Sequence, residues 1–219
     1  MTIVIYKLYD GRHVYCQSDF IHGWFNPKRN AMRVSREQAA ENRGKILHTA
    51  AQLFREKGFD GIGIADLMKK VGLTHGGFYG HFTSKEDLMK QTCAYAVDEL
   101  LAQGEAARAT TKGSKYKAYI SRYLSIGHRD NPGSGCLMAA LGADAARQSP
   151  AIKQAFTQSF NRLLSAMMNL LPATKTEAAK REQALLTLAT LVGAQVIARA
   201  VDDPKLSEEI LRVVNKKLH

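Results

Sequence analysis

The chain has 219 residues, 45% hydrophobic and 23% charged, so it should fold, as one large globular unit or two small ones. Its 31 Lys and Arg residues against 20 Asp and Glu residues give a formal charge of +11, which favours nucleic acid over an anionic membrane as a partner. The cysteines Cys16, Cys93 and Cys136 are scattered and odd in number, which indicates neither a disulfide framework nor a zinc site and fits a reducing cytoplasm.

Residues 1–34 form a predicted N-terminal extension. Within it, β-rich arms at residues 2–9 and 12–16 flank Asp10-Gly11, a dipeptide typical of a two-residue hairpin turn. The segment lacks the features of a secretory signal, so export is not indicated. Two interpretations stay open: sequence translated upstream of a usual start at Met32, or a genuine arm that packs on the domain or reaches toward DNA.

Helical periodicity begins at Arg36. A first helix, predicted to end near Lys57 at Gly58, carries one apolar stripe formed by Ile46, Ala50, Leu53 and Phe54. A second, short helix ends at Gly72, a residue suited to the left-handed backbone of a tight turn; its apolar residues are Ile64, Leu67, Met68 and Val71. Two further helix starts are predicted at the capping residues Thr74 and Ser84, the latter with Asp87 three residues beyond.

Two short helices joined by a glycine-containing turn indicate a helix-turn-helix unit. Glycine inside a helix costs roughly 1 kcal/mol against alanine, but it lets the backbone approach another surface closely. Phe78 and Phe82 are predicted to anchor the short helix in the core. Tyr79, His81 and Lys85 are predicted to contact phosphate, since a cation at a helix N-terminus is favourable where an anion binds.

The run from Ile64 to Leu88 resembles the DNA-binding domain of the TetR family of transcriptional regulators, and the similarity extends from about Arg43. The resemblance implies an all-α homodimer with a three-helix head, residues 35–83, that binds a palindromic double-stranded operator. It also implies a helical bundle, residues 84–219, for a small-molecule effector and dimerisation. Carried over by position, the implied DNA contacts are Arg43, Gly63, Ala65, Thr74, His75, Gly76, Gly77, Tyr79, His81 and Lys85.

One departure from the family concerns the start of the second helix. The family usually has Thr or Ser there, whereas this chain has Gly61-Ile62-Gly63-Ile64, and glycine brings no hydroxyl to a phosphate. With Gly76 and Gly77 also lacking side chains, base specificity is expected to depend on His75, Thr74, Ala65 and DNA shape.

Four further helices are predicted beyond Ala102, near residues 116–124, 152–167, 185–200 and 206–214, with a turn at 130–135 and a helix end at Leu171-Pro172. The last two carry small residues that allow close helix approach. In the resembled family, the corresponding pair forms a four-helix dimer interface, which implies contacts from Leu185, Leu188, Ala189, Val192, Gly193, Val196, Leu206 and Ile210.

The segment Gly135 to Asp144 resembles a pocket-wall segment in one subgroup of the family. Residues considered for ligand binding or redox sensing are Cys136, Met138, Tyr123 and Cys93. A thiol becomes reactive beside a cation or a helix N-terminus, and His128 and Arg129 lie just upstream of Cys136. Two roles stay open for Cys136, electrophile or oxidant sensing and a plain pocket or core position, while Cys93 is expected in the core.

Enzymatic function is not predicted, because the sequence contains no phosphate loop, dinucleotide fingerprint, H-E-x-x-H motif or G-x-S-x-G elbow. No cofactor or metal is predicted, although His128, Asp130 and Asp144 could in principle cluster. The most apolar run, Leu185 to Val201, contains Gln195 and Arg199, so no membrane span is expected. The predicted function is a ligand-responsive regulator, with repression favoured and activation open; the alternative is a helical ligand-binding dimer without sequence-specific DNA binding.

Overall fold

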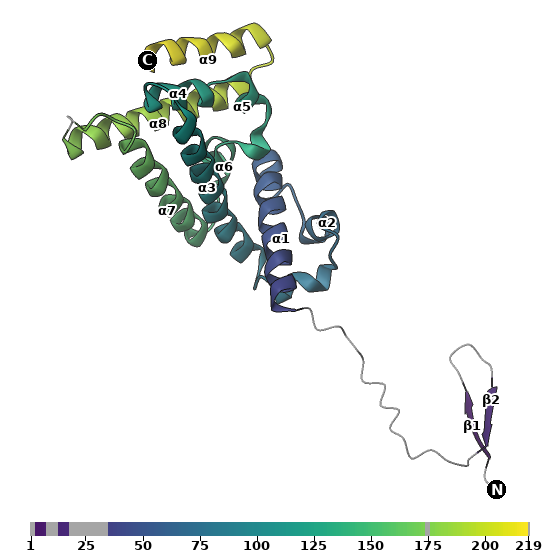
Figure 1. The fold of residues 1–219 in the computed structure, drawn as a ribbon. Helices are drawn as coiled ribbons and strands as arrows, with labels where there is room; N and C mark the ends of the chain where they lie inside the picture. Colours follow the sequence, from purple (N-terminus) through teal and green to yellow (C-terminus); the bar gives the residue numbers. More distant parts are fainter. Residues whose placement is uncertain (1–2, 8–12, 18–34, 174–175, 219) are drawn as a thin grey trace. The chain divides into compact units, whose positions relative to one another are not determined.

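The computed structural model of the protein describes residues 3–7, 13–17, 35–173 and 176–218 (Figure 1). Its contacts divide the chain into two compact units, Met1–Ser35 and Arg36–His219.

The first unit contains an antiparallel pair of strands, β1 (Ile3–Lys7) and β2 (His13–Gln17), as the sequence predicts. The register pairs Lys7 with His13 and therefore leaves five residues between the paired ends. This odd number differs from the expected two-residue turn at Asp10-Gly11, which would leave an even number between paired positions. The turn itself and the possible start at Met32 lie outside the described residues.

All regular elements in the described residues of the second unit are helices, which confirms the predicted all-α fold. Its elements are α1 (Arg36–Lys57), α2 (Ile64–Lys70), the 3₁₀ helix η1 (His75–Gly80), α3 (Lys85–Thr110), α4 (Lys115–Tyr123), α5 (Ile126–Asp130), the 3₁₀ turn η2 (Pro132–Ser134), α6 (Leu137–Ala145), α7 (Pro150–Met168), α8 (Glu177–Ala200) and α9 (Pro204–Leu218). The predicted turn at 130–135 is thus preceded by a short helix, and α7 ends before the expected Leu171-Pro172.

Two glycines end the first two helices, as predicted, because both adopt positive φ. Gly58 has φ +79° and Gly72 has φ +74°. At the end of α2, the Leu73 N–H donates to the Met68 carbonyl at 2.9 Å and the Gly72 N–H to the Lys69 carbonyl at 3.1 Å. This pair of hydrogen bonds is a Schellman motif, which satisfies carbonyls that the helix end would otherwise leave unpaired.

One continuous apolar core runs from the head, formed by α1, α2 and η1, into the C-terminal helices. In the head, Phe54 and Phe59 pack edge to face at 5.5 Å between ring centroids. Helix α1 also packs against α3, α6 and η2, while α3 packs along α7 (Figure 1). The head is therefore joined to the C-terminal helices by packed side chains as well as by the chain itself.

Helix α8 packs against α6, α7 and α9. Among the residues that the structure describes, it is the helix that is long and apolar enough to cross a bilayer by length and composition alone. Of the 18-residue apolar stretch of α8 that meets this criterion, 39% is buried inside the protein. Since core helices of water-soluble domains meet the same criterion, this is weak evidence for a membrane span.

Candidate nucleic-acid interface

The short helix η1 forms between the two predicted caps. The Thr74 hydroxyl accepts a hydrogen bond from the Gly77 N–H at 3.3 Å, and the Ser84 hydroxyl accepts one from the Asp87 N–H at 3.0 Å. The Asp87 carboxylate accepts from the Thr83 N–H, one residue before the position that a standard capping box would use. A hydrogen bond from Gln91 and the Thr83 N–H lower the pKa of Asp87, which keeps this cap ionised.

The aromatic residues of η1 and of the turn that follows it divide into a buried pair and an exposed ring. Phe78 and Phe82 are buried and stacked, with centroids 5.5 Å apart, which confirms their predicted role as anchors. Tyr79 is 60% exposed and meets His75 edge to face at 6.0 Å. The two anchors therefore fix η1 on the head while His75 and Tyr79 lie on its outer side.

The glycines of η1 leave the backbone accessible. A Cβ built on Gly76 would meet no heavy atom within 4 Å, and one on Gly77 would meet the Thr74 hydroxyl at 3.4 Å. Thr74, Gly76 and Gly77 are all exposed. No neighbour within the described part of the chain therefore requires glycine at position 76, which leaves contact with a partner as a physical reason for it.

Two half-buried residues, His81 and Lys85, flank this surface at the end of η1 and the start of α3. Lys85 occupies the first turn of α3, where the helix dipole disfavours a cation unless an anion is also present. The free N–H groups of that turn and the Lys85 ammonium can both donate to one phosphate.

The start of α2 offers backbone donors alone. Gly63 is its N-cap, without a side-chain hydrogen bond to the helix, and Ala65 in the first turn is exposed. A Cβ on Gly63 would approach Asp66 no closer than 3.6 Å, so a serine would fit here. Arg43 differs from the other predicted contacts, because it already donates to Gln91 and lies 5.0 Å over the Phe82 ring.

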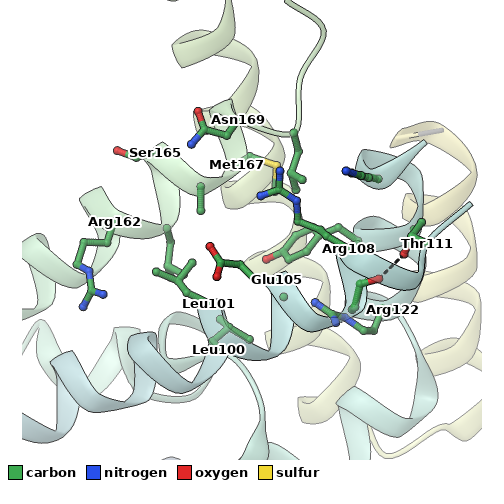
Figure 2. A pocket seen from close by; sticks show the side chains of 18 of the residues that line it. Leu100, Leu101, Glu105, Arg108, Thr111, Arg122, Arg162, Ser165, Met167 and Asn169 are labelled. Carbon is green, nitrogen blue, oxygen red and sulfur yellow. Dashed lines mark hydrogen bonds between the residues drawn. The ribbon is translucent and has the colours of Figure 1, made fainter. Parts of the chain in front are cut away.

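Two adjacent cavities lie in the part of the helical bundle that the structure describes. The larger, about 580 Å³, lies between α3, α4 and α7 (Figure 2). The smaller, about 240 Å³, is lined by Tyr123 and Cys136, two of the predicted ligand or redox residues. Met138 and Cys93 are buried and line neither cavity. Burial raises the pKa of the Cys93 thiol to about 12, which fits the inert core position expected for it.

Cys136 is buried at the N-cap of α6, and its N–H donates to His128 Nε2 at 3.0 Å. Of the two upstream groups expected beside it, His128 is in contact, whereas Arg129 instead binds Asp130 and Ser207. The cations that interact electrostatically with Cys136 are Arg55 and Arg199, from α1 and α8. No local pattern points to these two arginines, because they are about 60 to 80 residues away from Cys136 along the chain.

His128 is held neutral in this cluster. Burial lowers its pKa, and Arg199 and Arg122 lower it further against the opposing effect of a hydrogen bond to the Tyr123 carbonyl. Its Nδ1 lies 2.6 Å from that carbonyl, so both ring nitrogens are engaged. Asp130 and Asp144 pair with Arg129 and Arg147, and within the described part of the chain no three His, Cys, Asp or Glu side chains gather as a metal site would require.

The predicted dimer residues differ in how exposed they are within one chain. Leu185, Ala189, Val196 and Leu206 are exposed, and Val192, Gly193 and Ile210 are half-buried. Leu188 is only 4% exposed, so within one chain it already belongs to the core. Two residues that the sequence analysis did not select, Leu186 and Ile197, are 62% and 53% exposed and extend the apolar surface of α8.

Comparison with known proteins gives concordant results for sequence and fold. A family model described as bacterial regulatory proteins, tetR family, matches residues 46–92. The regulator CymR of Pseudomonas putida is 32% identical over 87 residues, 40% of this chain and 41% of CymR. The repressor NemR of Escherichia coli K12 is 28% identical over 138 residues, 60% of this chain and 67% of NemR.

Solved structures resemble the described fold over most of its length. The reduced form of E. coli NemR gives a TM-score of 0.68 at 21% identity, covering 81% of this chain and 95% of that one. A TetR-family regulator from Agrobacterium tumefaciens gives 0.66 at 22% identity, covering 82% and 98%. At such identities the likeness shows the fold alone.

The sequence matches are concentrated in the head. Alignments with CymR and with YerO of Bacillus subtilis span only 41% and 31% of those proteins' lengths. The matched residues nevertheless include α2, η1 and the start of α3, which form the surface described above. The family model identifies residues 46–92 as a TetR-type DNA-binding region, and the aligned regulators together with the shared fold support a TetR-family transcriptional regulator.

Proposed function

We propose that the protein is a ligand-responsive transcriptional repressor that binds a palindromic operator as a homodimer and is released by a small molecule. The observation that carries this proposal is the course of α3, which begins at Lys85 beside the exposed face of η1 and continues to the wall of the larger cavity. Its 26 residues span about 39 Å at 1.5 Å per residue. A single rigid helix thus connects the proposed DNA surface with the proposed effector site.

On the DNA side, η1 would enter the major groove, with His75, Gly76 and Gly77 at base edges. Tyr79, His81 and Lys85 would hold the phosphate backbone on one side, and the N-terminal turn of α2 would hold it on the other. Because few side chains reach the bases, sequence-dependent DNA shape is expected to supply part of the specificity.

The apolar surface of α8 and α9 supports the homodimer. Two copies joined there would place two η1 helices on successive half-sites, about 34–36 Å apart for one turn of DNA. A ligand that moves α3 would change this spacing and favour release. The ligand must therefore bind the DNA-incompetent state more tightly, since equal affinity for both states would shift nothing. As a soluble DNA-binding regulator, the protein would act in the cytoplasm.

Selection of bound sequences from a random duplex pool tests the proposal, with protein starting at Met1 and at Met32. We expect one enriched palindrome shared by both, bound with an affinity that falls steeply with salt. Transcription in vitro from a promoter carrying that palindrome would then distinguish repression from activation. No enrichment from folded, dimeric protein would refute the proposal and favour a helical ligand-binding dimer that does not read DNA sequence.

A further inference from the structure

The larger cavity combines an apolar wall with an excess of positive charge. Its apolar side chains include Leu100, Leu101, Leu163, Met167 and Leu170. Its charged side chains are four cations, Arg108, Lys115, Arg122 and Arg162, and one acid, Glu105. Figure 2 shows Glu105 and Arg108 extending from α3 toward the α7 side of the cavity. A volume of about 580 Å³ is within the range of about 300–1,000 Å³ typical of small-molecule sites.

Three of the four cations have no carboxylate partner among the residues that the structure describes. Arg162 is neutralised by Asp98, outside the cavity. Arg108, Lys115 and Arg122, by contrast, make no ion pair with any residue in the described ranges. Surface cations without partners are common, but these three converge on one concave space from two different helices, α3 and α4. Their combined field attracts an anion into that space.

Arg122 is held toward α3 by two features. Its guanidinium carbon lies 5.9 Å from the centroid of the Tyr119 ring, within the range of a cation–π contact. One of its terminal nitrogens lies 4.0 Å from where a Cβ on Gly104 would be, so the guanidinium lies against α3 beside a residue without a side chain. Gly104 precedes Arg108 by four residues, so Arg122 lies against the face of α3 from which Arg108 extends.

We propose that this cavity binds a small organic anion, a carboxylate or sulfonate on an apolar body, with its charged group held between Arg108 and Arg122. The inference rests on the proposed function only in identifying this anion as the effector. The apolar body would lie against the leucines and Met167, where it removes apolar surface from water. Guanidinium groups suit such a ligand because they bind carboxylate and sulfonate oxygens through two parallel N–H donors. Organic cations would meet three unpaired positive charges against one carboxylate.

A pair of fluorescent probes separates the charge from the apolar body. 1-Anilinonaphthalene-8-sulfonate carries a sulfonate, and N-phenyl-1-naphthylamine has the same ring system without it. For the full-length protein, we expect Arg108→Gln and Arg122→Gln each to weaken sulfonate binding about fivefold or more, and binding of the neutral probe to change less than twofold. Arg108→Lys, which keeps the charge, should retain most of the sulfonate affinity.

Glu105→Gln is expected to increase the affinity for the sulfonate probe, a change that misfolding of the variant would not produce. Removing the one acidic side chain of the cavity should strengthen sulfonate binding about twofold to threefold and leave the neutral probe unchanged. Lys153→Gln, which removes one positive charge from an exposed position on α7 outside the cavity, is the matched control for the two arginine variants. The proposal would be overturned if the arginine variants lost affinity equally for both probes. It would also be overturned if substitution of Arg108, Arg122 and Glu105 left the affinity for the sulfonate probe unchanged.

These measurements contain no DNA, so they fail or succeed independently of operator binding. If the protein binds the sulfonate probe selectively but selects no DNA sequence, the proposed anion site is supported and the proposed regulatory function is refuted. If the protein binds a specific operator but binds both probes independently of their charge, the proposed regulatory function is supported and the proposed anion site is refuted.

Discussion

Arg55 of α1 donates from Nη1 to the carbonyl of Gly135 at 3.3 Å, and Gly135 immediately precedes Cys136. The other terminal nitrogen lies 3.5 Å from a Glu99 carboxylate oxygen of α3, and Nε has no partner among the described residues. Arg55 is only 5% exposed, and burial lowers its pKa despite the opposing charge of Glu99. A buried cation with long hydrogen bonds thus joins the head to both the wall of the smaller cavity and the helix that leads to the larger one.

This geometry predicts that keeping the charge of Arg55 is worse than removing it. Lysine cannot reach Gly135 and Glu99 together and would leave a poorly satisfied buried ammonium, so Arg55→Lys should lower the free energy of unfolding by about 2–3 kcal/mol. Arg55→Met, which keeps much of the packing volume, should change it by about 1 kcal/mol or less. Urea unfolding at one fixed protein concentration measures both. Greater stability of the lysine variant would mean that the ion pair with Glu99 dominates.

Lys85 and Tyr79 are predicted to bind phosphate and not bases. Lys85→Ala should weaken binding to all duplex sequences and reduce the slope of log affinity against log salt by about one unit. Tyr79→Phe should weaken binding by about threefold to tenfold through one lost hydrogen bond, with an unchanged slope. Fluorescence anisotropy across a salt series measures both quantities. Lys153→Ala on α7 is the control for net charge, and a slope reduced equally by that variant would contradict the assignment of Lys85.

Gly76 provides a steric test of close backbone approach to DNA. Alanine fits at this position inside the protein and costs less than glycine in a helix, so Gly76→Ala should leave stability unchanged or slightly raised. If the backbone meets the base edges, the added methyl group should still weaken specific operator binding about tenfold or more. Gly80→Ala, in the same short helix and equally free of neighbours, should leave affinity unchanged. If Gly76→Ala binds the operator with unchanged affinity, the backbone at Gly76 does not contact the base edges.

How far the sequence predicts this structure depends on how local each cause is. Thr74, Ser84, Gly58 and Gly72 are all found in their expected roles, because a cap or a positive-φ glycine acts on groups within a few residues. The five-residue helix α5 was not predicted, since it is too short for an apolar period to emerge.

Features that depend on long-range packing were predicted less well. Leu185, Leu186 and Leu188 are near neighbours in sequence, and only the packing of α8 shows that Leu188 faces the core while Leu186 faces outward. The charge of the larger cavity was also missed, because it arises where Arg108 of α3 and Arg122 of α4 come together. Neither residue carries a local pattern that distinguishes it from an ordinary surface arginine.

His128 predicts a loss of stability in mild acid. Its pKa is lowered in the folded protein, mainly by burial, so below the unfolded value of about 6.5 the unfolded chain takes up a proton that the folded chain does not. The contribution of His128 is therefore present above about pH 6.5 and is lost as pH falls toward the folded pKa, with a slope of at most about 1.4 kcal/mol per pH unit.

Comparison with His128→Gln isolates this effect from the other histidines. Glutamine can still donate to the Tyr123 carbonyl and accept from the Cys136 N–H, but it does not titrate. Unfolding free energies between pH 5 and 7.5 should fall less steeply for the variant than for the parent protein. Parallel profiles would show that His128 titrates alike in the folded and unfolded states.

The exposed apolar residues of α8 predict how the proposed dimer can be disrupted without unfolding the protomer. Leu186→Glu and Ile197→Glu place a charge on a surface that one chain leaves open, so each should convert the dimer to a folded monomer at micromolar concentration. Light scattering after gel filtration measures the mass, and circular dichroism checks the fold. Operator affinity should fall in parallel, because a monomer contacts one half-site alone.

Two matched variants define what would contradict the assignment of this dimer surface. Ile126→Glu alters an equally apolar, 48% exposed residue on α5 and should leave the dimer intact. Leu188→Ala removes buried volume from the protomer core and should lower the free energy of unfolding by about 2–5 kcal/mol. A dimer that survives Leu186→Glu and Ile197→Glu but dissociates with Ile126→Glu would move the interface away from α8. The predicted position of the two η1 helices on DNA would then have to be derived from a different axis.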